Sequence, residues 1–327
     1  MIVRCHAVRI HETGGPETLR WEDVEVGDPG EGEVLLRQTA VGLNYIDTYH
    51  RSGLYPLPLP SGLGLEAAGV VERVGPGVRD VTARDRVAYA SAPIGAYAEY
   101  RVYPATRLVT VPAGITDEQA AGMMLRGMTT EYLVRRAFPV APGHTVLVHA
   151  AAGGVGSFAC QWLKHLGATV IGTAGGPEKT ALATSYGCDH VIDYRSQDIA
   201  ASVRSLTDGA GVNVVYDGVG RDTFEASLDC LAPRGMMVSF GNASGPVPAF
   251  NPLQLSRKGS LFLTRPTLAH YVGTRRELVE SAAALFDVVL NGAVRVDIRQ
   301  RYPLASAADA HRDLEGRRTT GTTILMP

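Results

Sequence analysis

The sequence predicts a two-domain α/β protein in which a β-rich unit precedes a doubly wound parallel sheet. Three observations lead to this fold class: the length of the chain, a change in the length and spacing of its apolar segments, and the position of its glycines. At 327 residues the chain exceeds the size at which a single hydrophobic core stops growing. Hydrophobic residues make up 45% of it and charged residues 20%, as in ordinary globular proteins and unlike disordered or coiled-coil chains.

The charge balance and the cysteines indicate which kind of partner the chain binds and in which compartment it lies. A formal net charge of −2 leaves no basic surface that would attract nucleic acid or an anionic membrane. No apolar stretch is long enough for a transmembrane helix, and the first residues lack the apolar core and cleavage site of a secretory signal. The four cysteines are widely spaced and form no metal or redox motif: Cys5, Cys160, Cys188 and Cys230. We therefore expect a cytoplasmic protein with reduced thiols that acts on a small molecule.

The segment up to about residue 125 predicts a β-rich domain. Short runs of β-branched and aromatic residues occupy positions 34–41, 69–74 and 86–90. Clusters of glycine, proline and aspartate separate them, as at residues 27–30 and 74–77. This pattern is typical of a mostly antiparallel sheet, so we assign residues 1–125 to a first domain.

Between residues 126 and 268 the apolar segments become shorter, more regular and nearly continuous. Five of them recur every 20–25 residues, with helix-compatible sequence between them. They occupy residues 145–150, 169–173, 190–194, 212–217 and 235–240. Strands that are apolar on both faces are typical of a parallel sheet covered by helices on both sides. A sixth run at 260–264 is expected to complete this second domain.

The C-terminal residues 269–327 are expected to return to the first domain. Apolar side chains recur at helical spacing over residues 275–290. The face that they predict consists of Leu278, Ala282, Leu285, Phe286 and Val289. The run at 321–325 is typical of a strand, which we expect to join the first domain.

Glycine is enriched, at 37 of 327 residues, and its placement points to a function. The first apolar run of the second domain leads directly into Ala-Ala-Gly-Gly-Val-Gly at residues 151–156, which fits the G-x-G-x-x-G fingerprint with Ala151 in its first position. An amphipathic helix follows and ends at Gly167. Its apolar stripe consists of Val155, Phe158, Ala159, Trp162, Leu163 and Leu166. This order of strand, glycine turn and helix is typical of a Rossmann dinucleotide-binding domain.

Two of these glycines have separate physical roles in such a site. A side chain on Gly153 would hold the backbone away from a pyrophosphate, which the free N–H groups at the helix start attract. Gly156 lets the helix pack closely against the strand. Sites that select NAD usually have a carboxylate about 20 residues further on, yet here the second strand ends at Ala174, with Lys179 just beyond. We therefore expect a preference for NADPH, with Glu178 as the residue that could instead take the acidic role.

With these segments in place, the chain resembles the medium-chain dehydrogenase/reductase superfamily. Within it, the chain is similar to the zinc-independent NADPH:quinone oxidoreductase branch, which includes zeta-crystallin. The superfamily resemblance also rests on residues 64–71 and 214–217; it runs nearly end to end, and for this branch it is most specific at residues 44–49, 51–56, 149–156 and 239–242. It implies a GroES-like catalytic domain and a Rossmann domain that binds NADPH.

The resemblance places two poor metal ligands where zinc alcohol dehydrogenases of the superfamily carry Cys and His. These positions are Asn44 and Leu65, neither of which offers the thiolate or imidazole that zinc prefers. The closely spaced cysteines of a structural zinc site are also missing. Glu66 remains beside Leu65, either in a site role or as a buried carboxylate paired within the domain. Without a Lewis acid, substrates that accept hydride readily are favoured, which means quinones and conjugated enones.

Asn44 and Tyr49 are the candidate catalytic residues, because the resemblance puts their segment beside the nicotinamide and both side chains can donate a hydrogen bond. A packed aromatic ring is the alternative for Tyr49, and orientation of the cofactor is the alternative for Asn44. By the same resemblance, the expected cofactor contacts are Asn44, Tyr45, Asp47, Tyr132, Gly153, Gly154, Val155, Gly175, Lys179, Tyr194, Phe240, Gly241, Asn242 and Arg317. Tyr194 would meet the adenosine half, and Arg317 would reach the 2′-phosphate unless it is a solvated surface residue. His149 is expected to be a core histidine.

Three functions remain open from the sequence. The first is a zinc-independent NADPH:quinone reductase, and the second is an NADPH-dependent reductase of enones or 2-alkenals. The third is a cofactor-binding protein with a structural role and negligible turnover, as in relatives that accumulate in the lens. The resemblance also implies a homodimer, for which the apolar residues 261–263 would offer an edge strand.

Overall fold

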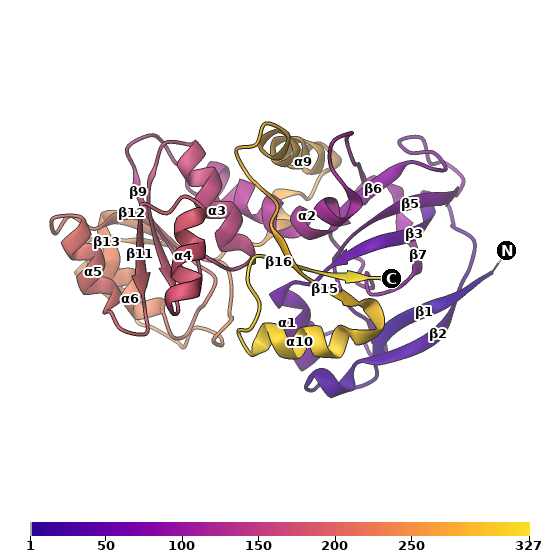
Figure 1. Cartoon of the computed structure of the whole chain (residues 1–327), viewed down its shortest axis with the longest axis horizontal. Coiled ribbons are helices and arrows are strands. Elements are labelled where there is room, and N and C mark those ends of the chain that lie inside the picture. The colour runs from indigo at the N-terminus through magenta and orange to yellow at the C-terminus, as the bar shows by residue number, and fades with distance from the viewer. Residues whose placement is uncertain (1) are drawn as a thin grey trace. The chain divides into compact units, whose positions relative to one another are not determined.

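The computed structural model describes residues 2–327, so Met1 of the predicted first domain lies outside the described residues. The chain, traced by colour in Figure 1, divides into two units. Unit 1 comprises the residues up to Met128 together with Val272–Leu290 and Val296–Pro327. Unit 2 comprises Thr129–Tyr271 and Asn291–Arg295.

Unit 1 contains two sheets, and its strands pair antiparallel except for β15 with β16. A three-stranded sheet has the order β2-β1-β4. A seven-stranded sheet has the order β15-β16-β3-β5-β6-β8, and β7 also pairs with β3. The bounds of these strands are β1 Val3–Ile10, β2 Arg20–Val26, β3 Glu33–Gly42, β4 Ser61–Gly62, β5 Glu66–Val74, β6 Arg86–Ala90, β7 Tyr100–Pro104, β8 Val109–Thr110, β15 Ile298–Pro303 and β16 Thr322–Met326. Because β16 lies beside β3, the C-terminal strand belongs to the same sheet as the N-terminal segments.

Four helices accompany these sheets: α1 Tyr45–Ser52, α2 Asp117–Tyr132, α9 Arg275–Leu290 and α10 Ala307–Glu315. Short 3₁₀ turns lie at Pro16–Thr18, Ala105–Arg107 and Leu304–Ser306, and the π-helical turn Leu133–Ala137 that follows α2 belongs to unit 2. The bounds of α9 agree with the predicted helix, but its buried face differs from the prediction. Val288 is buried, whereas Phe286 and Val289 are half-buried, because the face that packs inward is shifted around the helix axis.

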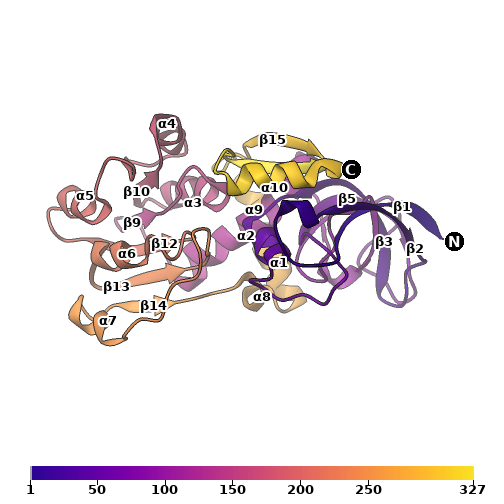
Figure 2. The ribbon, with the colours of Figure 1, turned by 90° about the horizontal axis from the view of Figure 1, so that it is seen from below.

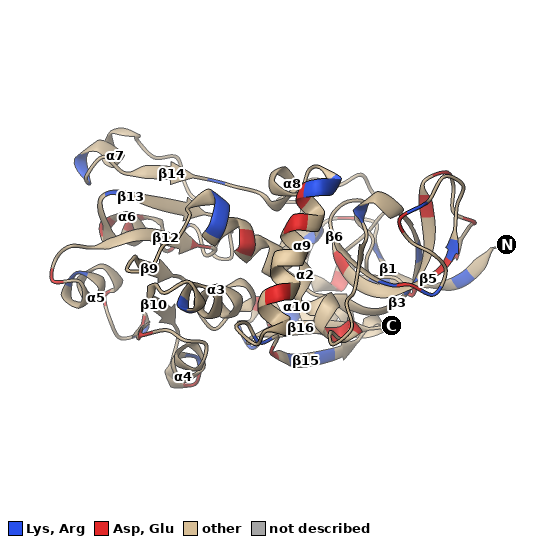
Figure 3. Ribbon diagram, turned by 90° about the horizontal axis from the view of Figure 1, so that it is seen from above, with Lys and Arg blue, Asp and Glu red and all other residues tan. Residues whose placement is uncertain are grey.

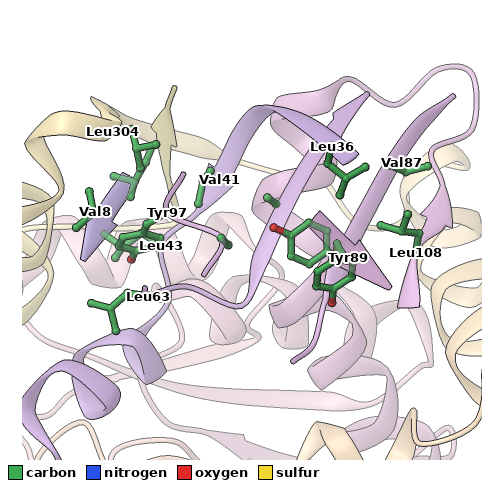
Figure 4. Packing of buried hydrophobic residues seen from close by; sticks show 14 of the residues in the cluster. Val8, Leu36, Val41, Leu43, Leu63, Val87, Tyr89, Tyr97, Leu108 and Leu304 are labelled. Carbon is green, nitrogen blue, oxygen red and sulfur yellow. The ribbon is translucent and has the colours of Figure 1, made fainter. Parts of the chain in front are cut away.

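The core of unit 1 joins side chains from both ends of the chain. One continuous cluster includes Leu36 of β3, Val87 of β6 and Leu304 of the C-terminal segment. Figure 4 shows two groups in it, with Val41 between them. The first group consists of Val8, Leu43, Leu63, Tyr97 and Leu304, and the second of Leu36, Val87, Tyr89 and Leu108. Apolar side chains of β3 therefore share one core with residues more than 200 positions away.

Unit 2 is the predicted parallel sheet. Its strands have the order β11-β10-β9-β12-β13-β14, which can be followed from β10 to β14 in Figure 2, and all pairs are parallel. The strand bounds are β9 Thr145–Val148, β10 Thr169–Ala174, β11 His190–Asp193, β12 Val212–Asp217, β13 Leu231–Ser239 and β14 Phe262–Thr264. The helix bounds are α3 Gly154–His165, α4 Pro177–Ser185, α5 Ile199–Leu206, α6 Phe224–Cys230, α7 Leu253–Arg257 and α8 Leu268–Tyr271.

The strand order of unit 2 reverses between β9 and β12, which makes this pair a topological switch point. Right-handed crossovers put α3 and α4 on one face of the sheet, and α5 and α6 on the other. Ligands of such sheets bind at the carboxyl ends of the strands beside the switch point. The predicted combination of a β-rich GroES-like domain with a Rossmann sheet is confirmed.

Acidic and basic residues are interspersed over both units, as Figure 3 shows. Among residues 2–327, no helix combines the length and the apolar character that crossing a membrane requires.

Candidate functional site

The carboxyl edge of the unit 2 sheet collects most of the glycines that the sequence singled out. The turn after β9 holds Gly153 and Gly156, and the turn after β10 holds Gly175. The segments after β11 and β13 add Tyr194 and Gly241. Since parallel strands all end at one edge, these separate turns of the chain form one surface.

The turn after β9 leads into α3 without a polar side chain at its start. Gly153 is the N-cap residue, and no side chain caps the helix. A Cβ on Gly156 would lie 2.2 Å from the carbonyl oxygen of Ala150 and 2.8 Å from Cα of Ala151, so only glycine lets α3 approach the strand this closely. The first-turn N–H groups of α3 lack intrahelical partners and attract an anion.

The turn after β10 is bound to the end of β11 through a carboxylate. Asp193 Oδ1 accepts hydrogen bonds from the backbone N–H groups of Gly176 and Arg195, both at 3.0 Å. These backbone hydrogen bonds lower the pKa of Asp193. A Cβ on Gly175 would fall 2.4 Å from Tyr194 Oη, and one on Gly176 would fall 3.0 Å from a guanidinium nitrogen of Arg195. A phenol and a guanidinium therefore cover a turn whose residues have no side chains.

The loop after β13 packs closely against the loop after β12. A Cβ on Gly241 would lie 2.3 Å from the carbonyl oxygen of Gly218, and Phe240 N–H donates to the carbonyl of Asp217 at 2.8 Å. Arg265, which follows β14, donates to the carbonyl of Gly241 at 3.0 Å. The backbone of this loop is thus held from two sides.

His149 is a buried core histidine, as predicted. Its Nε2 lies 2.9 Å from Ser227 Oγ, and its Nδ1 lies 3.1 Å from Thr173 Oγ1. Ser227 in turn donates to the buried Asp217 at 3.0 Å. Burial lowers the pKa of His149 and keeps its imidazole neutral.

In unit 1, the side-chain amide of Asn44 is held at both ends. Its Nδ2 donates to Glu66 Oε2 at 2.6 Å, and its Oδ1 accepts from Arg126 at 3.0 Å. Arg126 also donates to the carbonyl of Leu43 at 2.7 Å. These two contacts fix which end of the amide is the donor, and one N–H of Asn44 is left for another acceptor.

Glu66 reaches this position because the neighbouring backbone makes room for it. A Cβ on Gly42 would lie 2.2 Å from Glu66 Oε2 and 2.4 Å from the carbonyl oxygen of Ala121. Glu66 Oε1 accepts the backbone N–H of Leu125 at 2.7 Å. Burial raises the pKa of Glu66 to about 7, against the opposing effect of Arg126.

Asp47, in the first turn of α1, is fully buried. Its Oδ2 accepts the backbone N–H of Asn44 at 2.8 Å and the hydroxyl of Tyr97 at 3.0 Å. Burial raises the pKa of Asp47 to about 7, although both hydrogen bonds act to lower it. Tyr97 also contacts His311 of α10, at 3.0 Å from Nε2.

An aromatic cluster covers the outer part of α1. The Tyr49 ring is buried, with its centroid 5.7 Å from the ring of Tyr45 and 5.2 Å from the ring of Tyr55. Burial raises the pKa of the half-buried Tyr45, and the nearby Arg317 opposes this effect. Such a cluster offers planar apolar surface next to the hydrogen-bonding groups of Asn44.

Comparison with known proteins identifies the family. Two family descriptions match parts of the chain: "Alcohol dehydrogenase GroES-like domain" over residues 30–113 and "Zinc-binding dehydrogenase" over residues 154–287. A quinone oxidoreductase of Pseudomonas aeruginosa is 54% identical over 315 residues, which are 96% of this chain and 97% of the relative. The chain belongs to the quinone oxidoreductase family. The predicted resemblance to this branch of the medium-chain dehydrogenase/reductase superfamily is confirmed.

Solved structures and a second kind of relative place the chain further within the quinone oxidoreductase family. The crystal structure of Escherichia coli quinone oxidoreductase complexed with NADPH has a TM-score of 0.97 and 48% identity, covering 98% of this chain and 100% of that one. A 2-haloacrylate reductase of a Burkholderia species is 48% identical over 329 residues, or 98% of each chain. The family thus includes proteins named for two substrate classes.

One of the matching descriptions names zinc. Among residues 2–327, no group of three or more His, Cys, Asp and Glu side chains is placed to hold a metal ion. At the two positions compared with zinc ligands lie Leu65 and Asn44, whose amide is engaged by Glu66 and Arg126.

The predicted site residues fall into two sets. Those in unit 2 meet at the carboxyl edge of the sheet: Gly153, Gly154, Val155, Gly175, Lys179, Tyr194, Phe240, Gly241 and Asn242. Those in unit 1 lie on or beside α1 and in the loop after α10: Asn44, Tyr45, Asp47, Tyr49 and Arg317. Asp47 and Tyr132, the other two predicted cofactor contacts, are both buried: Asp47 lies under Asn44 and Tyr97, and the Tyr132 ring stacks on Tyr271 at 4.4 Å.

Several residues of the site were missed by sequence reasoning. Arg195 follows Tyr194 directly, and its place after the third strand of the parallel sheet was a usable signal. Arg265 lies 24 positions from the glycine whose carbonyl it holds. Arg126 and His311 join their partners across 82 and 214 positions, and no local pattern reports such contacts.

Proposed function

We propose that the chain is an NADPH-dependent quinone reductase that transfers hydride from NADPH to a quinone without zinc. The observation that carries this proposal is the N-terminus of α3, which follows β9 directly, starts at Gly153 and has no side-chain cap, at the carboxyl edge of a parallel sheet. The 54% identity to a quinone oxidoreductase over nearly the whole chain supports the substrate class. When bound, the nicotinamide supplies the hydride, while the protein binds, orients and shields.

The residues of unit 2 fit NADPH as follows. The backbone of Gly153, Gly154 and Val155 would bind the pyrophosphate at the N-terminus of α3. Lys179 and Tyr194, together with the newly found Arg195, would bind the 2′-phosphate beside Gly175 and Gly176. The buried Ala174 ends β10 where an NAD-selecting protein has a carboxylate, so no acidic side chain at that position repels the phosphate.

The residues of unit 1 fit the substrate side. Reduction of a quinone leaves negative charge on oxygen, which a hydrogen-bond donor stabilises. Asn44 keeps one N–H for this purpose or for orienting the nicotinamide, because its other N–H and its oxygen are engaged. The Tyr49 hydroxyl is the second donor that we propose. By the resemblance, we also propose Arg317 as a contact of the cofactor. The proposed cofactor domain spans residues 126–268, and residues 1–125 and 269–327 form the catalytic domain.

A substrate panel with both nicotinamide cofactors tests the proposal. Under anaerobic conditions, NADPH should be oxidised by 1,4-benzoquinone or 1,4-naphthoquinone, more slowly with NADH, and equally with or without a chelator. Absence of turnover across the quinones, with NADPH binding intact, would instead support a structural cofactor-binding role. A loss of activity with chelator would contradict the zinc-independent mechanism.

Reduction of activated alkenes is the second candidate function. It is favoured by the 48% identity to a 2-haloacrylate reductase, whose named substrate carries a carbon–carbon double bond conjugated to a carboxylate. Faster turnover of 2-alkenals, cyclic enones or 2-haloacrylates than of any quinone would select this alternative.

We also propose a cytoplasmic homodimer. Strand β14 is the edge of the unit 2 sheet, and its Phe262 is 57% exposed, which suits pairing with a second copy. Light scattering should give twice the chain mass, and Phe262→Asp should give the monomer.

The four cysteines are free thiols, in keeping with a reducing compartment such as the cytoplasm. Cell fractionation tests the compartment.

A further inference from the structure

The buried polar set around Asn44 contains two acids facing one guanidinium. Asp47 and Glu66 are both 0% exposed, and Arg126 is 4% exposed. With both acids ionised, these three groups would carry a net charge of −1 away from water, which is strongly unfavourable. One bound proton makes the set neutral. The hydrogen bonds show which acid takes it.

Glu66 has no oxygen without a donor. Its Oε1 accepts the N–H of Leu125 and its Oε2 accepts the amide of Asn44, while Arg126 adds electrostatic attraction. Two donors and an adjacent cation stabilise the ionised form.

Asp47 distributes its contacts unequally. Oδ2 accepts two donors, the N–H of Asn44 and the hydroxyl of Tyr97. Oδ1 is buried and has no hydrogen-bond partner among residues 2–327. An ionised Asp47 would therefore leave negative charge on an oxygen without a donor, whereas a neutral acid leaves a single O–H unsatisfied, at a smaller cost of about 1–3 kcal/mol.

A chain of side chains fixes Tyr97 as a donor to Asp47. Arg51 can only donate, so the Nδ1 of His311 at 3.1 Å from it must accept, which leaves the hydrogen on Nε2. That Nε2–H points at the Tyr97 oxygen, and the Tyr97 hydrogen is then directed to Asp47. Burial, followed by the charge of Arg51, lowers the pKa of His311 to about 3, which agrees with a neutral ring. Arg51 is anchored by Glu315 at 2.7 Å.

We propose that Asp47 carries the proton on Oδ1 and serves as a neutral positioning residue, holding the backbone of Asn44 through Oδ2 while Glu66 stays ionised beside Arg126. Burial raises the pKa of Asp47 and of Glu66 to about 7 alike. The two acids differ in their hydrogen bonds, because each oxygen of Glu66 has a donor and Oδ1 of Asp47 has none. The charged and titratable groups that face Asp47 are Glu66 from β5, Arg126 from α2 and Tyr97, with His311 of α10 behind Tyr97.

The consequence for catalysis rests on the proposed function. Negative charge develops on the quinone oxygen during reduction, and ionisation of Asp47 would add a second negative charge beside Asn44. We therefore expect kcat/KM for a quinone to fall about tenfold as Asp47 ionises above neutral pH, and Asp47→Asn to abolish that fall. Asn is the matched variant, because its Oδ1 accepts the same two donors and its amide nitrogen takes the place of the protonated oxygen.

Carboxyl ¹³C NMR of the cofactor-free protein tests the proton's place without any activity. In protein labelled only at aspartate carboxyls, one signal should titrate near neutral pH and be absent in Asp47→Asn. Protein labelled only at glutamate carboxyls should show no such signal, and Glu66→Gln should leave the aspartate signal present. A neutral-range titration in the glutamate sample alone, or in neither sample, overturns the proposal.

The NMR experiment locates the proton even if a variant does not fold or the proposed function is wrong. If Asp47→Asn does not fold, the two labelled wild-type samples still separate aspartate from glutamate. If no quinone is turned over, the NMR result stands and only the proposed function fails. A flat wild-type pH profile with a confirmed neutral Asp47 would refute the catalytic consequence.

Discussion

The two units arrange their polar groups in opposite ways. In unit 2, the N-terminus of α3 has no side-chain cap, and the Arg195 guanidinium has no side-chain hydrogen bond or salt bridge within residues 2–327. In unit 1, Asn44, Glu66 and Asp47 form most of their hydrogen bonds with one another and with neighbouring groups inside the protein. Unit 2 thus leaves groups that a bound ligand would engage, whereas unit 1 holds its groups in place through internal contacts.

This difference separates the expected effects of mutation. Removing a member of the buried set in unit 1 leaves an uncompensated charge or polar atom, so stability should change first. Removing a group from the edge of unit 2 breaks few internal contacts, so cofactor binding should change while the fold remains.

Arg126→Met should have the largest effect. It removes the guanidinium that faces Glu66 and supports the Asn44 amide, and it leaves the buried, ionised Glu66 without a countercharge. We expect the free energy of unfolding to fall by about 3–5 kcal/mol, measured by urea denaturation. Arg276→Met is the control, because its exposed pair with Glu280 on α9 contributes at most about 0.5 kcal/mol. Equal losses would show that Arg126 is not a buried countercharge.

The stability of the protein should depend on pH with a sign set by Asp47. Burial raises the pKa of Asp47 from an ordinary 3.8 to about 7, so between these values the folded protein binds a proton that the unfolded chain has released. The contribution of Asp47 to stability should therefore be greatest below about pH 4 and fall as the pH rises towards 7. Urea denaturation across this range should show the decline, and Asp47→Asn should reduce its slope. A rise over the same range in both proteins would contradict the assignment of raised pKa values.

The fold of both units could be predicted from local sequence. The five apolar runs and the glycine turn of unit 2 are contiguous segments, and each corresponds to a strand or turn at the expected place. The packing role of Gly156 could also be predicted, because a residue at this position between strand and helix lies where the two backbones approach closely.

The buried set of unit 1 could not be predicted, because its members are distant in sequence. Asn44 was identified by resemblance, but its partners Glu66 and Arg126 lie 22 and 82 positions away. Asp47 was expected at the cofactor, and only the packing of Tyr97 against it shows that it is covered. Hydrogen bonds between side chains of remote segments leave no periodic pattern in the sequence, so they can be recognised only in the tertiary structure.

Gly156→Ala should weaken NADPH binding about 10- to 100-fold. The new Cβ would meet backbone atoms of Ala150 and Ala151 that cannot rotate away, so α3 must shift from the position that aims its N-terminus at the pyrophosphate. Titration of NADPH fluorescence measures the affinity. Gly27→Ala serves as the control, since nothing lies within 4 Å of its added Cβ and its affinity should be unchanged. Unaltered binding in Gly156→Ala would show that the helix start does not hold the cofactor.

Arg195→Ala should raise KM for NADPH about tenfold and leave KM for NADH nearly unchanged, because one charge-assisted contact to the 2′-phosphate is lost. Arg257→Ala is a matched control in the same unit. Arg257 is also exposed, but it lies on α7, which precedes the edge strand β14, whereas Arg195 follows β11 at the opposite edge of the sheet. An equal rise in KM for both cofactors would mean that Arg195 does not distinguish them.

Tyr49→Phe should have the smallest effect, a two- to tenfold loss of kcat for a quinone, which corresponds to about 0.5–1.5 kcal/mol for one hydrogen bond. The ring itself should keep its packing against Tyr45 and Tyr55, so stability and KM for NADPH should hardly change. Tyr103→Phe is the control, because it removes a hydroxyl bonded to the carbonyl of Ser91 and should lower stability without lowering kcat. If kcat were unchanged in Tyr49→Phe, its ring would be a packed aromatic only, and Asn44 would be left as the proposed donor in unit 1.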